Sequence, residues 1–261
     1  MQMNDVNKTL YIPLYGKAYV SRKGIILHDP KAEAIWAAEE FPLKGKSKSR
    51  YLAYYMGMRS AVFDRWLKSK MEEDPNAVVL HIGCGMDSRI ERVGTRGHVW
   101  YDIDFPDVIV QRKRYYRESE HYKMLGADVR TGDWLDSIPG GSAVVIMEGV
   151  SMYLKRDELR QLLRGFAGHF GQVSVLMDCY TEFAARASSF RNPINDVGVT
   201  NVYGLDNPEQ LENTGLNFVG EHDMTPGDLV EELRGMEKKL FKILYAGSVA
   251  GKMYRLYEYR R

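Results

Sequence analysis

Two glycines, Gly83 and Gly85, close a short apolar run and form the turn with the clearest chemical potential in the sequence. The run 78–82 is apolar apart from His81, and a polar segment follows Gly85. This pattern predicts a buried parallel strand that turns sharply and continues into a helix. Glycine adopts torsions that other residues avoid and has no Cβ to block a ligand. Because ligands of open α/β sheets bind beyond the carboxyl ends of the strands, we expect a nucleotide-like cofactor here.

Acidic residues follow the next three apolar runs. Asp104 ends the run 99–104 and lies 21 positions after Gly83, Asp128 follows the run 122–126, and Glu148 follows the run 143–147. A carboxylate about 20 positions after the glycine turn is the one that binds ribose hydroxyls in such folds. A single acidic residue there could be a helix N-cap. Three at one sheet edge favour a cationic or hydroxyl-rich ligand.

The charges around the turn discriminate between nucleotides. A dehydrogenase fingerprint would carry a third glycine at position 88, where this sequence has Ser88. Asp87 lies near the expected helix start, where it would repel a pyrophosphate. S-adenosylmethionine has no phosphate and carries a positive sulfonium. The sequence therefore favours S-adenosylmethionine, and a nicotinamide-dependent dehydrogenase is the alternative from another enzyme class.

These residues must be positioned by alternating strands and helices. Strands are predicted at residues 78–82, 99–104, 122–126, 143–147, 173–177, 218–220 and 253–259. Helices are predicted from residue 30, over 49–70, from 105, over 155–170 and over 225–245, after an irregular lead-in over 1–30. The alternation predicts an α/β fold with a doubly wound parallel sheet. The last strand follows a helix, so it could insert antiparallel at an edge.

Composition limits the other functions of this 261-residue chain. The net charge of +1 gives no field that points to nucleic acid or a membrane surface, and no apolar run has membrane-spanning length. The basic cluster Arg112–Arg114 is interpreted as a solvated helix face. Two cysteines make a disulfide framework improbable and indicate a reducing cytoplasm. The Cys and His spacing predicts no metal site.

Four motifs, in order along the chain, resemble those of the leucine carboxyl methyltransferase family, including its polyketide carboxyl O-methyltransferases of the tetracenomycin type. The motifs are His81-Ile82-Gly83-Cys84-Gly85-Met86-Asp87-Ser88-Arg89, Tyr101-Asp102-Ile103-Asp104-Phe105-Pro106, Gly126-Ala127-Asp128-Val129-Arg130 and Glu148-Gly149-Val150-Ser151-Met152-Tyr153. The resemblance covers roughly residues 10–180.

The resemblance implies a class I Rossmann-like methyltransferase fold. Its sheet would have seven mostly parallel strands and an antiparallel last strand. The single domain would comprise an N-terminal helical cap (1–74), a cofactor-binding core (75–180), a lid or substrate segment after strand five (181–215), and a C-terminal helix with edge strands (216–261). S-adenosyl-L-methionine would be the cofactor and S-adenosyl-L-homocysteine the product.

The resemblance also implies roles for the residues of the glycine turn and the strand ends. Gly83 and Gly85 would let the methionine part of the cofactor approach. Asp104 would bind the ribose hydroxyls. Asp128, together with the Val129 amide, would meet the adenine.

Four further positions match the family outside or at the end of this core. Glu148 would lie near the amino group of the methionine moiety. Lys17 resembles an N-terminal lysine that reaches the cofactor. Arg59 resembles an arginine that meets the cofactor carboxylate or the acceptor, and Tyr153 a tyrosine that faces the acceptor. Arg59 and Tyr153 are therefore the expected catalytic residues.

The expected reaction is methyl transfer to a carboxylate oxygen of a small molecule, polyketide-like under the resemblance. A carboxylate is already ionised at neutral pH, so positioning and water exclusion suffice. A phenol or alcohol acceptor would need a base, for which His28 and His121 are candidates, although each is better interpreted as structural or exposed. A protein C-terminal carboxylate is another acceptor, and a non-catalytic cofactor-binding module is the remaining alternative. Cys84 is interpreted as a small residue that fits the turn.

Overall fold

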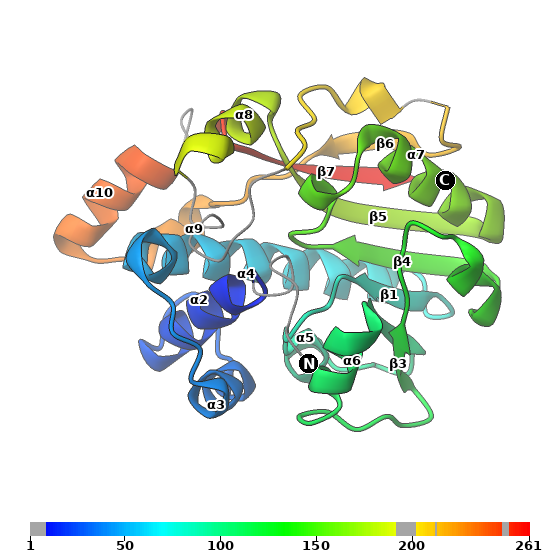
Figure 1. Cartoon of the computed structure of the whole chain (residues 1–261), viewed down its shortest axis with the longest axis horizontal. Helices are drawn as coiled ribbons and strands as arrows, with labels where there is room; N and C mark the ends of the chain where they lie inside the picture. Colours follow the sequence, from blue (N-terminus) through cyan, green and yellow to red (C-terminus); the bar gives the residue numbers. More distant parts are fainter. Residues whose placement is uncertain (1–8, 192–201, 212, 247–250) are drawn as a thin grey trace.

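Seven strands form one sheet in the described part of the computed structural model, which comprises residues 9–191, 202–211, 213–246 and 251–261. Their order is β3-β2-β1-β4-β5-β7-β6 (Figure 1). The strands are β1 (Val78–Ile82), β2 (Trp100–Asp104), β3 (Tyr122–Gly126), β4 (Gly141–Met147), β5 (Phe170–Tyr180), β6 (Asn217–Glu221) and β7 (Tyr254–Arg260). Strands β1 to β5 pair in parallel, and β7 runs antiparallel to both β5 and β6. The α/β class and the antiparallel last strand are confirmed.

Helices cover both faces of this sheet. They are α2 (Tyr11–Arg22), α3 (Pro30–Glu39), α4 (Arg50–Glu73), α5 (Arg89–Val93), α6 (Pro106–Arg112), α7 (Arg156–His169), α8 (Glu182–Arg191), α9 (Gly227–Glu231) and α10 (Gly235–Tyr245), with 3-10 turns at Gly45–Lys48, Asp133–Ser137, Ser151–Tyr153 and Pro208–Leu211. Among the described residues, no helix has both the length and the apolarity to cross a bilayer.

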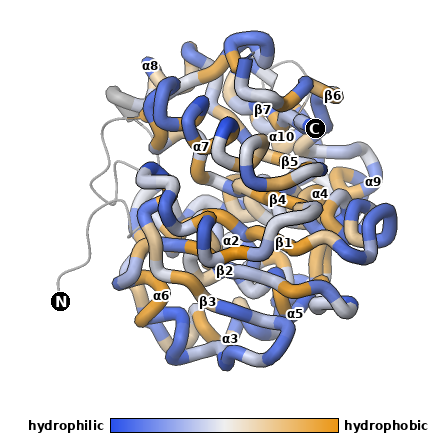
Figure 2. Tube along the Cα trace, turned by 90° about the vertical axis from the view of Figure 1, so that its right-hand side faces the viewer, coloured by the Kyte–Doolittle hydropathy of each residue, from blue (hydrophilic) through white to orange (hydrophobic). Residues whose placement is uncertain are grey.

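The strands are apolar on both sides because each side meets a separate core. Val79 of β1 and Val144 of β4 pack into the core beneath α4, whereas their neighbours Leu80 and Val145 pack into the core beneath α7. Successive strand residues point to opposite faces, so a strand buried on both faces is a continuous apolar run. Figure 2 shows these hydrophobic stretches along the central strands. The sheet thus holds the carboxyl ends of β1, β2 and β4 side by side.

The prediction of an irregular lead-in over 1–30 is wrong for part of that range, since α2 occupies residues 11–22. Pro13 falls in the first turn of the helix, where a missing amide proton is tolerated. Gly16 lies inside α2 because the helix packs closely on α4: a Cβ there would lie 2.7 Å from the Met56 Cβ. The glycine therefore marks a helix–helix contact, and α2 carries Lys17 into the interior.

The C-terminal region also differs from prediction in two respects. The last strand was expected at an edge, but β7 lies between β5 and β6. Leu256, Tyr257 and Tyr259 fill both cores, whereas β6 is mostly exposed and forms the edge. The predicted helix over 225–245 is two helices: residues 232–234 separate α9 from α10, and Gly235, which starts α10, has a φ angle of 54°.

The segment after β5 contains α8 and the 3-10 turn Pro208–Leu211. Residues 192–201 and 212 of the expected lid lie outside the described residues. The division of the chain into cap, core, lid and C-terminal part stays a prediction.

Candidate active site

A cavity of about 310 Å³ opens at the carboxyl ends of β1, β2 and β4. Every residue predicted for the site lines it, although they come from α2, α4, the end of β2, a 3-10 turn and the three loops after β1, β3 and β4: Lys17, Arg59, Gly83, Gly85, Asp104, Asp128, Val129, Glu148 and Tyr153. A volume near 300 Å³ suits a small-molecule site. The structure brings these residues together, and the role of each remains a prediction.

The glycine turn after β1 forms one wall of the cavity. Gly83 and Gly85 have φ angles of 63° and 49°, a region that favours glycine. A Cβ on Gly83 would lie 2.4 Å from Cγ2 of Val150, and one on Gly85 would lie 3.3 Å from Cβ of Leu10. The turn therefore needs glycine at position 83 for its backbone and for the close approach of Val150, and glycine at position 85 mainly for its backbone.

Asp104 at the end of β2 holds this turn and faces the cavity. Its Oδ2 accepts a hydrogen bond from the Gly85 amide at 2.7 Å, and its Oδ1 accepts one from the Phe105 amide at 2.8 Å. Burial of the carboxyl raises the pKa of Asp104 to about 6. The hydrogen bonds from the two backbone amides and the charge of Arg112 act in the opposite direction but do not outweigh burial. Each oxygen keeps acceptor capacity, so two ribose hydroxyls could donate to the same carboxylate.

Asp128, after β3, is half-buried and held by a neighbour. Its oxygens accept hydrogen bonds from the Arg130 amide at 3.1 Å and from the Arg130 guanidinium at 2.8 Å. The bond from Arg130 lowers the pKa of Asp128, so the carboxyl is ionised at neutral pH. Asp128 and Val129 line the same cavity as Asp104. An adenine amino group would share the Asp128 carboxylate with Arg130.

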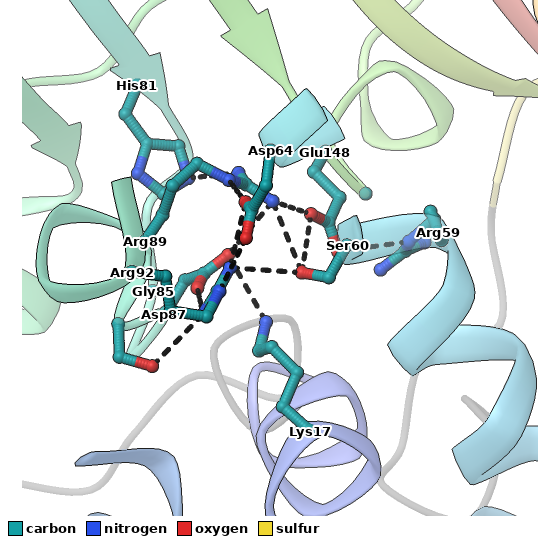
Figure 3. A network of polar contacts seen from close by, with 12 residues as sticks. Lys17, Arg59, Ser60, Asp64, His81, Gly85, Asp87, Arg89, Arg92 and Glu148 are labelled. Atoms are coloured by element: carbon teal, nitrogen blue, oxygen red, sulfur yellow. Dashed lines mark hydrogen bonds and ion pairs between the residues drawn. The ribbon is translucent and has the colours of Figure 1, made fainter. Parts of the chain in front are cut away.

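A buried ionic network lies beside the cavity (Figure 3), and Lys17, Asp87 and Glu148 of this network line it. Lys17 reaches Asp87 at 3.2 Å, and Arg92 reaches the same carboxylate at 2.9 Å. Arg89 pairs with Glu148 and, at 2.6 Å, with Asp64. Lys17 comes from α2 and Asp87 from the glycine turn, so the network ties α2 to the end of β1 at the cavity.

Arg59 joins this network from α4. Its Nε donates to Glu148 at 3.1 Å and its Nη1 to Asp178 at 2.9 Å, while the side chain is only 4% exposed. Burial opposes ionisation of Glu148, but the Arg59 and Arg89 guanidiniums outweigh it and lower the Glu148 pKa. Asp178 also accepts the Gly149 amide at 2.6 Å. Arg59 is thus a fixed cation at the cavity wall.

Counted over the described residues with every carboxyl ionised, the network carries one more negative than positive charge, although burial raises the pKa of the Asp178 carboxyl. Its bases are Lys17, Arg59, Arg89 and Arg92, and its acids are Asp29, Asp64, Asp87, Glu148 and Asp178. S-adenosylmethionine carries a net charge of +1 at neutral pH, from its ammonium, carboxylate and sulfonium groups. A site that lacks one positive charge fits such a ligand.

This arrangement changes the argument made from Asp87 alone. Lys17, Arg89 and Arg92 surround that carboxylate. Burial alone would raise the pKa of Asp87, but the three cations outweigh burial and hold this pKa well below its usual value. Asp87 is therefore neutralised locally and would not by itself repel a pyrophosphate. The charge preference belongs to the whole network.

The interpretation of Arg112 as part of a solvated face is wrong. Arg112 is fully buried, its Nε donates to Asp102 at 2.8 Å, and its Nη1 donates to the Gly85 carbonyl at 3.0 Å. Lys113 is solvated, as expected, and pairs with Glu118 on the surface. Arg112 supports the glycine turn from behind, a role that no motif in the sequence revealed.

His81 lies in the same buried layer. Its Nδ1 is 3.0 Å from Asp102, and its Nε2 is 3.2 Å from Nη1 of Arg89. Because arginine only donates, Nε2 must accept, and the ring proton resides on Nδ1. Burial lowers the pKa of His81, so the ring is neutral.

Sequence reasoning gave no role to Arg89 or Arg92. One signal could have indicated them, namely two arginines at i and i+3 directly after the turn.

The remaining candidates for acid–base or nucleophilic chemistry do not enter the cavity as bases. His28 and His121 are exposed and do not line it. Cys84 is buried, and burial raises the pKa of its thiol well above the usual value. Tyr153 is half-buried at the cavity, and burial raises its pKa as well. The described residues contain no group of His, Cys, Asp and Glu suited to a metal.

Comparison with known proteins identifies the fold and the reaction. The family model "Leucine carboxyl methyltransferase" matches residues 11–167, which include helices α2, α3 and α4, the glycine turn and all three acidic strand ends. The chain belongs to the leucine carboxyl methyltransferase family. The match begins at α2, whose Lys17 enters the ionic network.

Two relatives align with most of this chain. It is 30% identical to "Tetracenomycin polyketide synthesis O-methyltransferase TcmP" from Streptomyces glaucescens over 91% of this chain and 90% of the relative. It is 28% identical to "S-adenosyl-L-methionine-dependent methyltransferase dpfgK" from Gibberella zeae over 66% of this chain and 64% of the relative. The family member is thus an S-adenosylmethionine-dependent O-methyltransferase, as the sequence predicted.

Solved structures share the fold. Magnesium protoporphyrin IX methyltransferase from Synechocystis PCC 6803, with bound SAH, superposes with a TM-score of 0.52 at 9% identity over 94% of this chain and 97% of that one. A methyltransferase described as putative, from Thermobifida fusca YX, gives a TM-score of 0.56 at 13% identity over 94% of each chain. At these identities the likeness establishes the Rossmann-like methyltransferase fold alone.

Proposed function

We propose that this methyltransferase esterifies a carboxylate of a small, polyketide-like acid. The observation that carries the proposal is the buried, fixed Arg59 guanidinium, in a cavity wall whose described residues include no histidine free to act as a base. His81 is the one histidine among the described lining residues, and its Nε2 is engaged by Arg89. A carboxylate acceptor needs a cation to orient it and no base to deprotonate it.

The cofactor would be held along the strand ends. Asp104 would accept the ribose hydroxyls and Asp128 would meet the adenine, with the glycine turn against the methionine part. Glu148 and Lys17 would pair with the ammonium and carboxylate groups of that part. The bound cofactor supplies an electrophilic methyl group on a positive sulfur.

The protein's own contribution is orientation and exclusion of water. Within the described residues Arg59 donates hydrogen bonds through Nε and Nη1, which leaves Nη2, beside Gly149, for an acceptor carboxylate. Tyr153 would fix the second carboxylate oxygen. No proton moves when a carboxylate becomes a methyl ester, so holding reactants in line is the main catalytic requirement. Thr9, Leu10 and Pro13 cover the cavity from the cap and would exclude bulk water.

The relatives support the acceptor class. The name of the Streptomyces glaucescens relative places that protein in polyketide synthesis, and the family name specifies carboxyl methylation. We also propose that the enzyme acts in the cytoplasm on a free small molecule and needs neither nucleic acid nor a membrane.

The test is methyl transfer from labelled S-adenosylmethionine to 2-naphthoic acid, a simple aryl acid. We expect a labelled product whose methyl group is released as methanol by mild alkali, because esters hydrolyse and aryl ethers do not. Substrate 2-naphthol serves as the hydroxyl counterpart. Alkali-stable label on 2-naphthol, with none on the acid, would show that the acceptor is a hydroxyl group.

A further inference from the structure

Two tyrosines from neighbouring strands meet in the cavity beyond Arg59. Tyr180 ends β5, Tyr254 begins β7, and the two residues stand directly opposite in the antiparallel ladder. Their ring centroids are 4.5 Å apart with the planes at 85°, an edge-to-face contact. Both line the cavity. Directly opposed residues of an antiparallel pair share one face of the sheet, so the rings form one aromatic wall.

The wall is fixed from behind. Tyr55 of α4 packs on Tyr254 with centroids 5.5 Å apart, and its hydroxyl contacts Sδ of Met224 at 3.4 Å. Tyr180 is 4% exposed. Rings held on both strands and supported by a helix lose little freedom when a ligand packs on them, so the wall is preorganised.

The register of β5 places this wall next to Arg59. Asp178, which fixes Arg59 at 2.9 Å, precedes Tyr180 by two positions on the same strand. Residues i and i+2 of a strand share a face and lie about 7 Å apart. An acid whose carboxylate meets Arg59 would therefore bring a ring attached directly to that carboxylate against Tyr180. The side chains of Leu52, Met56 and Met152 complete an apolar surround.

We propose that Tyr180 and Tyr254 determine acceptor specificity by packing on the aromatic ring of an aryl carboxylic acid. The proposal rests on the proposed function for the carboxylate and adds the recognition of the ring. Aromatic rings gain from offset or edge-to-face contact beyond the area they bury, whereas a saturated ring of the same outline gains only the burial.

The experiment measures binding to the enzyme loaded with S-adenosylhomocysteine. The matched ligands are 2-naphthoic acid and decahydronaphthalene-2-carboxylic acid, which share the carboxylate and the two-ring outline. We expect the aromatic acid to bind roughly 3- to 10-fold more tightly. Tyr180→Leu and Tyr254→Leu should bind the two acids equally, whereas Tyr180→Phe and Tyr254→Phe should keep the preference for the aromatic acid. Tyr203→Leu, outside the cavity, is the matched control and should also keep it.

Folding is monitored in every variant by its affinity for S-adenosylhomocysteine, which should stay within about twofold of the wild type. If a leucine variant fails to bind it, the other leucine variant and the two phenylalanine variants decide. Equal binding of the two acids by the wild type, an unchanged ratio in a folded leucine variant, or no binding of either acid would overturn the proposal.

The acceptor group is tested separately from the ring. If 2-naphthol is methylated in place of the acid and the leucine variants lose the aromatic preference, the proposal of a carboxylate acceptor fails. The proposal that the two tyrosines recognise the ring then stands. Esterification of both acids without a ring preference would retain the proposed function and refute the wall.

Discussion

Acidification should weaken cofactor binding through Asp104. In the free enzyme this carboxyl has a pKa of about 6, because burial disfavours its charge. The ionised form can accept two ribose hydroxyls while it accepts the Gly85 and Phe105 amides. A protonated carboxyl would lose acceptor capacity at the oxygen that carries the proton. The cofactor should therefore bind the ionised form.

The magnitude follows from the fraction of ionised enzyme. At pH 8 nearly all molecules carry the carboxylate, whereas at pH 5 about one in eleven does, given a pKa of about 6. The apparent Kd for S-adenosylhomocysteine should rise about 10-fold between these pH values, or about 1.4 kcal/mol. Most of the change should fall below pH 6.

Isothermal titration calorimetry from pH 5 to 8 measures this dependence. Near pH 6, binding should release about half a proton per complex, which appears as a heat that depends on the ionisation enthalpy of the buffer. Asp104→Asn should bind more weakly at every pH and lose the Asp104 component of the slope, while other titrating groups contribute equally to both proteins. An equal slope in the asparagine variant would refute the role of Asp104.

Three further predictions concern the cation, the turn and the buried histidine. Arg59→Ala should lower turnover or cofactor affinity at least 10-fold and Lys113→Ala less than twofold in the same assay; similar effects would remove Arg59 from the site. Gly83→Ala should destabilise the fold by about 2–4 kcal/mol in urea unfolding, more than Gly97→Ala, because both have positive φ angles but only position 83 is crowded. Burial lowers the pKa of His81 in the folded chain. Below about pH 6.5 the unfolded chain therefore binds a proton at His81 that the folded chain does not bind. The free energy of unfolding should fall as pH decreases from about 6.5 towards the folded pKa, by up to about 1.4 kcal/mol per pH unit. Urea titrations of His81→Asn should lack this component, and an identical pH slope would show that the ring titrates normally.

The strand ends could be predicted because each combines two local signals. The short, largely apolar runs before Gly83, Asp104 and Glu148 have the length and flanking turns of central strands, and parallel strands bring their carboxyl ends to one edge. Because each acidic residue directly follows or ends its strand, the shared edge of the sheet brings the acidic side chains together. The ribose carboxylate needed only this topology and its spacing from the turn.

The residues that sequence reasoning missed depend on contacts between distant segments. Arg112 is an ordinary basic residue by pattern, and only the approach of α6 to Asp102 makes it a buried ion. Gly16 signals a break by composition, whereas the closeness of α4 makes it a packing residue. β7 has the alternation of an edge strand, yet β6 covers it. Asp102 lies 10 positions from Arg112, and the partners of Gly16 and β7 lie tens of positions away; contacts of this kind leave no signal in propensity or periodicity.

The position of β7 has a consequence for how the enzyme assembles. Tyr180 and Tyr254 stand opposite each other although 74 positions separate them along the chain. Closing such a long connection costs entropy before any contact compensates for it, so we expect β5 to pair with β7 late in folding. Until then β5 exposes an unpaired edge, a surface through which partly folded chains aggregate. The proposed acceptor wall would thus be the last part of the site to form, after the elements that line the rest of the cavity.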